Sequence, residues 1–163
     1  MKGKNKVVLF FTALCSALVA CTQGDFDQMV KKTVDSETPY VYPDSIVLEE
    51  NTVFLDARER EEFEVSHIEG ARFIGYKTFD LSKVEDIDKQ TPIVVYCSIG
   101  YRSGEIGEQL LEAGFTNVLN LYGGIFYWVN NGHEVVDHKG ATQNIHGYNR
   151  IWKRWVKKGK VQI

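Results

Sequence analysis

The sequence predicts an α/β fold in which an open parallel sheet carries helices on both faces. Strand-like and helix-like segments alternate with short connections along residues 52–131, and that alternation is typical of parallel sheets. The strongest strand signal is Pro92–Cys97, a continuous apolar run as expected of a strand covered on both faces. The chain has 163 residues, 44% hydrophobic and 25% charged, which excludes a disordered, fibrous or multi-span membrane protein.

The first predicted strand–helix unit lies at the start of this region. Thr52–Asp56 is β-branched and aromatic, as strands are, and residues 58–65 are charged around an apolar phenylalanine, as a surface helix is. A second short strand is predicted at Ala71–Ile74. Apolar residues recur at helical spacing through residues 79–87, so a second helix is predicted there.

Two more strand–helix pairs are expected after Pro92–Cys97. Residues 104–113 place their apolar side chains on one helical face and end at Gly114, a residue suited to a helix C-cap. Residues 117–122 are predicted to form a strand, and residues 125–131 a short helix. A domain of about 100 to 120 residues is enough for one such core.

The carboxy-terminal segment differs from the rest in charge. Residues 138–163 hold seven lysines and arginines and no acidic residue, whereas residues 21–137 hold 9 basic and 22 acidic residues. Four aromatic and aliphatic residues fall on one helical face of the segment: Tyr148, Ile151, Trp152 and Trp155. The extension is therefore predicted to be an amphipathic helix docked on the domain. Its basic face has three alternative explanations: it is simply solvated, it contacts anionic lipid headgroups, or it attracts an anionic substrate to the site. The acidic remainder of the chain argues against nucleic-acid binding.

The amino terminus is predicted to be a bacterial lipoprotein signal peptide. Three lysines stand among the first six residues, and the apolar run at residues 7–20 is too short to cross a bilayer and typical of a secretory signal. The run ends in Leu18–Cys21, which resembles the lipobox of bacterial lipoproteins. A plain signal peptide cut after Ala20 and a buried strand are the alternatives, but neither explains a cysteine at that position.

The lipobox resemblance implies where the mature protein lies. Residues 1–20 would be removed, and Cys21 would carry the lipid that anchors the protein to a membrane of the bacterial cell envelope, outside the cytoplasm. Residues 21–39 are then a tether, and the domain begins at Tyr40. The membrane is thus an expected partner through the amino-terminal lipid.

Cys97 is the one thiol expected to stay free in the mature chain. Cys15 leaves with the signal and lipid blocks Cys21, so no internal disulfide is possible. An unpaired cysteine in an oxidising compartment is a liability unless its reactivity is used. Cys97 also ends the strongest strand, and ligands of open parallel sheets bind beyond the carboxyl ends of the strands.

The loop after Cys97 has the composition of an anion cradle. It leads into a helix, so its backbone amides and the helix N-terminus favour a thiolate over a thiol. Gly100 permits the backbone conformation that inward amides need, and Arg102 adds a fixed cation. We therefore predict a nucleophile at the base of this cradle. Four histidines and one thiol show no metal-ligand spacing.

Four segments, in order, resemble those of rhodanese-domain sulfurtransferases. They are Leu55–Glu59 with Glu62 and Phe63, His67–Ala71, Cys97–Arg102, and Tyr122–Ile125 with Trp128 and Gly132. The resemblance runs from about Tyr40 to Val136 and implies a rhodanese-like α/β fold over residues 40–137. The basic extension, residues 138–163, lies outside the shared pattern.

The resemblance also implies an activity. It implies a sulfurtransferase that moves sulfane sulfur from a small anionic donor, such as thiosulfate, to a thiol or cyanide acceptor through a Cys97 persulfide. No cofactor and no metal are implied. The catalytic residues would be Cys97 and Arg102. The residues implied to bind the substrate are Ser98, Ile99, Gly100, Tyr101 and Ser103.

Several other polar residues near the predicted site have both a functional and a purely structural interpretation. Asp56 lies at the same sheet edge as Cys97 and is expected either to support the loop by pairing with an arginine or to form a plain N-cap or surface ion pair. Arg58 joins that network or lies in solvent. His67 is interpreted as structural rather than as an acid–base group. His146 and Tyr148 either reach the site or simply pack.

One difference from the family pattern, and three alternative functions, bear on which substrate the protein uses. Many thiosulfate-using members have a basic residue where this chain has Ser98, which weakens thiosulfate as the natural donor. Related cell-cycle phosphatases have a Cys-x5-Arg loop, but Cys97 and Arg102 are spaced Cys-x4-Arg, a tighter ring suited to one sulfur. A persulfide carrier that serves an unknown protein acceptor, or a non-catalytic binding module, stays an alternative.

Overall fold

The computed structural model describes residues 25–46, 49 and 51–163. These residues fall into two compact units, with the boundary between Thr33 and Val34. The described part of the first unit is a helix at residues 25–33, within the segment that the sequence predicts to be a tether. The predicted signal peptide and Cys21 lie outside the described residues. Within the described chain, no helix is long and apolar enough to cross a membrane.

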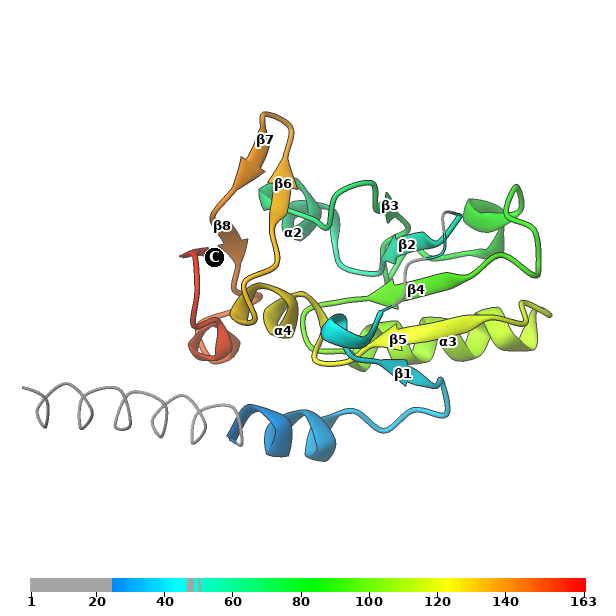
Figure 1. Ribbon diagram of the computed structural model, residues 1–163, viewed down its shortest axis with the longest axis horizontal. Coiled ribbons are helices and arrows are strands. Elements are labelled where there is room, and N and C mark those ends of the chain that lie inside the picture. The colour runs from blue at the N-terminus through cyan, green and yellow to red at the C-terminus, as the bar shows by residue number, and fades with distance from the viewer. Residues whose placement is uncertain (1–24, 47–48, 50) are drawn as a thin grey trace, which may run out of the picture. The chain divides into compact units, whose positions relative to one another are not determined.

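A five-stranded parallel sheet forms the centre of the second unit (Figure 1). Its strands are β1 (Tyr40–Val41), β2 (Val53–Asp56), β3 (Arg72–Phe73), β4 (Ile93–Tyr96) and β5 (Val118–Leu121). The strand order is β1-β5-β4-β2-β3, and every pair is parallel. The strand after which Cys97 lies, β4, is therefore the central one.

Helices cover both faces of this sheet, as the sequence predicts. On one face Leu55 and Val95 join a core with Ile106 and Leu110 of α3 (Tyr101–Glu112). On the other face Phe54 packs edge to face on Trp128 of α4 (Gly124–Asn130), with 6.1 Å between the ring centroids. Because all four residues of β4 are buried, that strand has no polar face. The prediction of an open parallel sheet with helices on both faces is confirmed.

The two helices expected before β4 are shorter than the sequence predicts. The helix expected at residues 79–87 is only a 3₁₀ turn, η2 (Leu81–Val84), because the Asp80 carboxylate caps the Ser82 amide at 2.9 Å and favours a turn. Of the three apolar residues at helical spacing, Val84 and Ile87 are buried and Leu81 is 46% exposed, so the spacing identified two core residues but not the helix type. The helix expected at residues 58–65 is α2 (Arg60–Val65).

Strand β1 was not predicted, because two residues are too few to show an alternating pattern. It pairs with β5, and its flanks are held by two further backbone bonds. The Asn120 amide donates to the Pro39 carbonyl at 2.7 Å, and the Tyr122 amide donates to the Val41 carbonyl at 2.9 Å. A 3₁₀ turn, η1 (Pro43–Ser45), follows it.

The carboxy-terminal extension does not form the predicted amphipathic helix. Its first strand, β7 (Gly140–Thr142), pairs antiparallel with β6 (Val135–Asp137), which precedes the extension, and its next two strands, β8 (Asn144–His146) and β9 (Lys160–Gln162), form a parallel pair. A 3₁₀ turn, η3 (Trp152–Trp155), stands between β8 and β9. The chain thus turns back on itself repeatedly at this end of the unit (Figure 1).

Glycines and turn residues explain why the extension does not form a helix despite the helical spacing of its apolar residues. Gly159 has a left-handed backbone conformation, with φ at 98°, which no α-helix contains. A side chain at Gly147 would place its Cβ 2.6 Å from Lys153 Cβ, so the chain makes a close turn there. Asn149 then caps η3 through the Ile151 and Trp152 amides. The helical stretch is consequently only one turn long.

Candidate active site

Cys97 directly follows β4, at the carboxyl edge of the sheet, and is 1% exposed. The Gly100 amide donates to its Sγ at 3.2 Å. Gly100 is the N-cap of α3 and has a left-handed conformation, with φ at 106°. Glycine adopts that conformation without the steric cost that other residues meet, so the predicted need for glycine at this position is met in the structure.

The carbonyl side of the loop is held by the first turn of α4. The Ile125 amide donates to the Cys97 carbonyl at 2.9 Å, and the Phe126 amide donates to the Ser98 carbonyl at 3.2 Å. A side chain at Gly124 would place its Cβ 2.3 Å from the Cys97 carbonyl oxygen. Gly124 therefore permits a backbone-to-backbone approach that fixes the loop, a role that the sequence did not reveal.

Asn120 fixes the other end of the loop. Its Nδ2 donates to the Gly100 carbonyl at 2.8 Å, while its Oδ1 accepts from Ser103 Oγ at 2.7 Å. Both side chains are buried. Ser103, predicted to bind substrate, thus has its hydroxyl directed to β5 and positions the loop. The signal for Asn120 was a polar residue within the apolar run of β5.

Arg102 does not stand alone in the loop. Its Nη1 and Nη2 donate to the two carboxylate oxygens of Glu62 at 2.7 and 2.9 Å. Ser98 Oγ lies between them, 3.0 Å from both Glu62 Oε1 and Arg102 Nη2. The two charged side chains are 11% and 2% exposed, so the pair is largely shielded from water.

Glu62 belongs to the site, although in the sequence it stands out only as part of the segment Leu55–Glu59 with Glu62 and Phe63. It is the third residue of α2, where its side chain also accepts from the Glu59 amide at 3.0 Å, completing a capping box. Composition does not separate it from Glu61 and Glu64, because all three stand in one acidic stretch. The spacing between Glu59 and Glu62 was the available signal.

Burial and pairing act in opposite directions on this ion pair. Burial disfavours both charges, but hydrogen bonding and charge attraction outweigh it. The pKa of Arg102 is raised above its usual value, by Glu62 and also by the nearby Cys97, and the pKa of Glu62 is lowered. The pair is therefore ionised at neutral pH, and a cation stands beside the sulfur.

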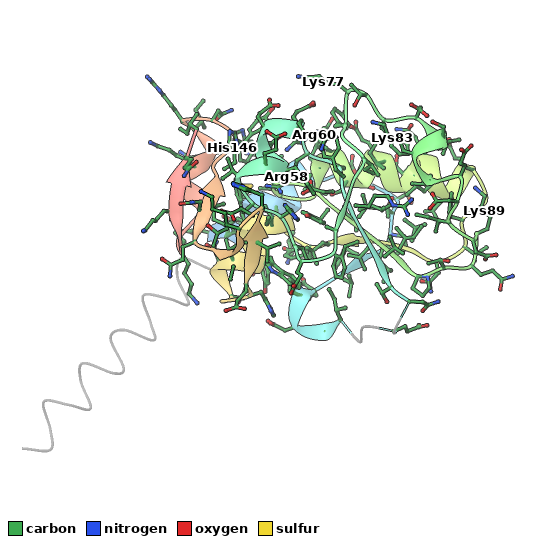
Figure 2. The ribbon with its side chains drawn as sticks, turned by 90° about the horizontal axis from the view of Figure 1, so that it is seen from above. Arg58, Arg60, Lys77, Lys83, Lys89 and His146 are labelled. Carbon is green, nitrogen blue, oxygen red and sulfur yellow. The ribbon has the colours of Figure 1, made fainter. Side chains whose placement is uncertain are left out.

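Tyr148 from the carboxy-terminal extension reaches this site. The Arg102 guanidinium carbon lies 5.0 Å from the centre of the Tyr148 ring. Tyr148 has a left-handed backbone, with φ at 63°, and its amide donates to His146 Nδ1 at 3.1 Å. His146 itself stands on β8, which lies beside α2 (Figure 2). Of the two open candidates, Tyr148 contacts the site and His146 supports it.

Asp56 and Arg58 form a buried ion pair, with both side chains 0% exposed and Nη2 2.7 Å from Oδ2. Figure 2 shows Arg58 within the fold, whereas Lys77 projects from the surface. Arg58 Nη2 also donates to the Ser66 carbonyl at 2.6 Å. The alternatives of a surface ion pair and an Asp56 N-cap are wrong, because the pair is shielded and Glu59 caps α2.

This buried pair lies against Tyr96, the residue before Cys97. Arg58 stands 5.7 Å from the centre of the Tyr96 ring, and Asp56 is opposite Tyr96 in the sheet. Burial, and then the Asp56 charge, raise the pKa of Tyr96 well above its usual value. The Tyr96 hydroxyl oxygen accepts from the Ile68 amide at 3.1 Å, so this side chain links β4 to the loop after α2.

The remaining predicted residues lie around the loop. Ile99 is buried, whereas Tyr101 is 44% exposed at the start of α3. His67 stacks on the Phe63 ring at 3.9 Å and its Nδ1 lies 3.0 Å from the Phe63 carbonyl, which agrees with a structural role. Over the described residues, no group of three or more histidine, cysteine, aspartate or glutamate side chains is placed to hold a metal ion.

A family model of the rhodanese-like domain matches residues 45–131. The chain belongs to the rhodanese-like domain family. A thiosulfate sulfurtransferase of Coxiella burnetii, GlpE, is 31% identical over 83 residues, which are 51% of this chain and 77% of that protein. The adenylyltransferase and sulfurtransferase UBA4 of Meyerozyma guilliermondii is 35% identical over 144 residues, which are 78% of this chain and 32% of that protein.

Solved structures agree on the fold. A rhodanese-related protein from Thermoplasma volcanium matches with a TM-score of 0.53 and 25% identity, covering 60% of this chain and 97% of that one. The expected rhodanese-like α/β fold is thereby confirmed. The family match ends at residue 131, so the rhodanese-like domain receives Tyr148 from a segment beyond it.

Proposed function

We propose that this rhodanese-like protein is a sulfurtransferase in which Cys97 carries sulfane sulfur as a persulfide. The observation that carries the proposal is the Gly100 amide at 3.2 Å from Cys97 Sγ, in a loop with a fixed cation. A sulfur anion is stabilised by a backbone amide donor and a neighbouring positive charge. The relatives named as sulfurtransferases support the same chemistry.

Sulfur transfer takes place in two displacements. The Cys97 thiolate attacks the outer sulfur of a donor such as thiosulfate, the donor's S–S bond breaks, and its electron pair leaves with sulfite. The acceptor, a thiolate or cyanide, then attacks the terminal sulfur of the persulfide. That sulfur–sulfur bond breaks and Cys97 is released as a thiolate. The chemistry calls on no cofactor.

Each residue of the site has its own role in this reaction. The amide of Gly100 stabilises the sulfur, and Arg102 supplies the positive charge beside it. Because Glu62 already engages two nitrogens of Arg102, the arginine fixes the loop as well as attracting an anion. Its charge is largely balanced by Glu62, which favours donors carrying less negative charge than thiosulfate. The Ser98 hydroxyl in place of a basic side chain acts in the same direction.

A persulfide carrier serving one protein acceptor is the second candidate. It uses the same Cys97 persulfide, but the sulfur passes only to the partner protein and not to small acceptors. Turnover with small donors and acceptors separates the two functions. A phosphatase is disfavoured by the Cys-x4-Arg spacing of Cys97 and Arg102.

We also propose that the protein is lipid-anchored in the bacterial cell envelope, outside the cytoplasm. The support is the basic start, the apolar run at residues 7–20 and the Leu18–Cys21 lipobox. Incorporation of labelled palmitate by the full chain, lost in Cys21→Ser, is the expected result. Labelling that survives the substitution would contradict the assignment.

The test of sulfur transfer is the intact mass of the chain from Thr22 before and after thiosulfate, followed by cyanide. That chain keeps every described element. We expect one added sulfur, which cyanide removes as thiocyanate, and no addition in Cys97→Ser. A protein that alkylates readily at Cys97 but gains no sulfur from thiosulfate or from a protein persulfide would contradict the proposal.

A further inference from the structure

The charges of this chain are separated along its length. Residues 138–163 carry seven lysines and arginines without one acidic residue, while residues 21–137 carry a net charge of −13. A chain with opposed ends is oriented by a charged surface, because one end is attracted and the other repelled. An anionic surface would therefore meet the extension first.

The cations of the extension are available to such a surface. All seven are exposed, and none forms an ion pair with another described residue. Figure 2 shows nitrogen-tipped side chains that project outward from this end of the chain. Their charge is therefore not balanced by the acidic remainder of the protein, within the part of the chain that the structure describes.

Apolar side chains are exposed among these cations. Seven large hydrophobic residues are exposed in the described chain, and four lie in residues 148–163: Tyr148, Ile151, Val161 and Ile163. Ile151 is 65% exposed and Ile163 60%. The half-buried Trp155 ring lies near two cationic groups, with Arg154 at 5.1 Å and Lys157 at 5.8 Å. Aromatic and aliphatic side chains interspersed with lysines are typical of surfaces that lie at the membrane–water interface.

We propose that residues 148–163, the extension surface, dock on an anionic phospholipid membrane. The cations supply electrostatic attraction to lipid headgroups, and the exposed isoleucines enter the headgroup layer. The acidic remainder disfavours a long nucleic acid, which would meet repulsion beyond the patch. An acidic protein would satisfy the cations but gives no reason for exposed aliphatic side chains beside them.

This proposal does not depend on sulfur chemistry or on the amino-terminal lipid. The extension surface belongs to the same compact unit as the sheet, and Cys97→Ser is expected to bind membranes as the unchanged chain does. Tyr148 belongs to both the extension surface and the candidate site. Docking would consequently bring the site close to the lipid headgroups.

The experiment is co-sedimentation of the unlipidated chain from Thr22 with phosphatidylglycerol-containing vesicles and with pure phosphatidylcholine vesicles. We expect binding to the first that weakens as salt rises, little binding to the second, and a blue shift of tryptophan fluorescence on binding. Replacing Lys153, Lys158 and Lys160 by Gln removes three cations, each worth about fivefold in affinity near the surface. The expected loss is on the order of a hundredfold.

Two further variants make the outcome specific. The matched control replaces Lys77, Lys83 and Lys89 by Gln, which removes the same charge from the second unit at a distance from the extension (Figure 2) and is expected to change affinity by less than about threefold. Ile151→Ser is expected to weaken vesicle binding about tenfold at any salt concentration. Equal effects of the two triple variants, or equal binding to both kinds of vesicle, would overturn the proposal. Binding of polyglutamate as tightly as vesicles, unaffected by Ile151→Ser, would assign the surface to an acidic protein instead.

Discussion

The Tyr148 ring covers the guanidinium group of Arg102, with 5.0 Å between the Arg102 Cζ and the ring centre. Arg102 stands in the first turn of α3, directly after the loop that follows β4, whereas Tyr148 lies beyond the family match at residues 45–131. The contact therefore adds an aromatic wall to a site that the family match alone does not complete. It also gives a reason for a strained backbone at Tyr148, where φ is 63°.

Substitutions at Tyr148 separate its backbone strain from its ring contact. Both Tyr148→Gly and Tyr148→Ala remove the ring, but only glycine is relaxed in a left-handed conformation. We expect the glycine variant to be more stable than the alanine variant by about 1 kcal/mol in urea unfolding. Equal stability of the two would contradict the strained backbone.

The ring contact is tested by the reactivity of Cys97. Tyr148→Ala opens the Arg102 side of the site, so alkylation of Cys97 by iodoacetate is expected to accelerate several-fold. Tyr148→Phe keeps the ring over Arg102 and is expected to react as the unchanged protein does. Acceleration by both variants would instead point to the hydroxyl group as the shielding element.

Glu62→Gln is expected to destabilise the fold at neutral pH by about 2–3 kcal/mol, because it leaves the Arg102 charge without its anion. The pKa of Glu62 is lowered in the folded state, so its contribution is complete above its unfolded value of 4.5. That contribution is lost as the pH falls through the folded pKa. The measurement is urea unfolding of both proteins across this pH range. The difference between them should be constant above pH 4.5 and shrink below it, and a constant difference at all pH values would contradict the assignment.

The buried pair of Asp56 and Arg58 predicts a large effect of a single substitution. Arg58→Met leaves the Asp56 carboxylate buried without a cation and is expected to cost about 3–5 kcal/mol in urea unfolding. The matched control is Arg72→Met, which breaks an ion pair whose side chains are 39% and 62% exposed and is expected to cost less than about 1 kcal/mol. Similar losses in the two variants would show that the buried pair is not special.

Gly124→Ala tests the close approach of α4 to the loop. Gly124 and Gly114 both have positive φ, at 56° and 90°, so alanine is strained at either position. Only at Gly124 does the new Cβ meet another backbone, at 2.3 Å from the Cys97 carbonyl oxygen. We expect Gly114→Ala to cost about 1 kcal/mol and Gly124→Ala at least about 2 kcal/mol more, with loss of persulfide formation.

Local signals predicted the sheet because its central strand carries an unmistakable pattern. Residues 93–96 are apolar on both faces, and the chain before and after them alternates between strand and helix. The helix predicted in the extension was wrong because the pattern behind it is short. Its helical spacing spans only eight residues, and the close turn at Gly147 and the left-handed Gly159 prevent a helix from continuing. Spacing over so short a segment does not outweigh backbone geometry at its ends.

The part of the site built from residues close together in the sequence was predictable. The part built from residues of distant elements was not. Cys97, Gly100 and Arg102 stand in one loop, so their spacing identified the cradle. Glu62 and Asn120 reach it from α2 and β5, and their partners lie 40 and 20 residues away in the sequence. Contacts of that kind depend on strand order, which local pattern does not give.

The bonds that hold the loop also determine where it could change length in evolution. The carbonyls of Cys97 and Ser98 are bound by α4, and the carbonyl of Gly100 is bound by Asn120. Ile99 is the residue between these two anchored ends. An insertion beside Ile99 would enlarge the ring while these three carbonyl bonds persist, whereas an insertion between Cys97 and Ser98 would separate the two carbonyls that α4 binds. A related protein that binds a larger anion is therefore expected to carry its extra loop residue beside Ile99.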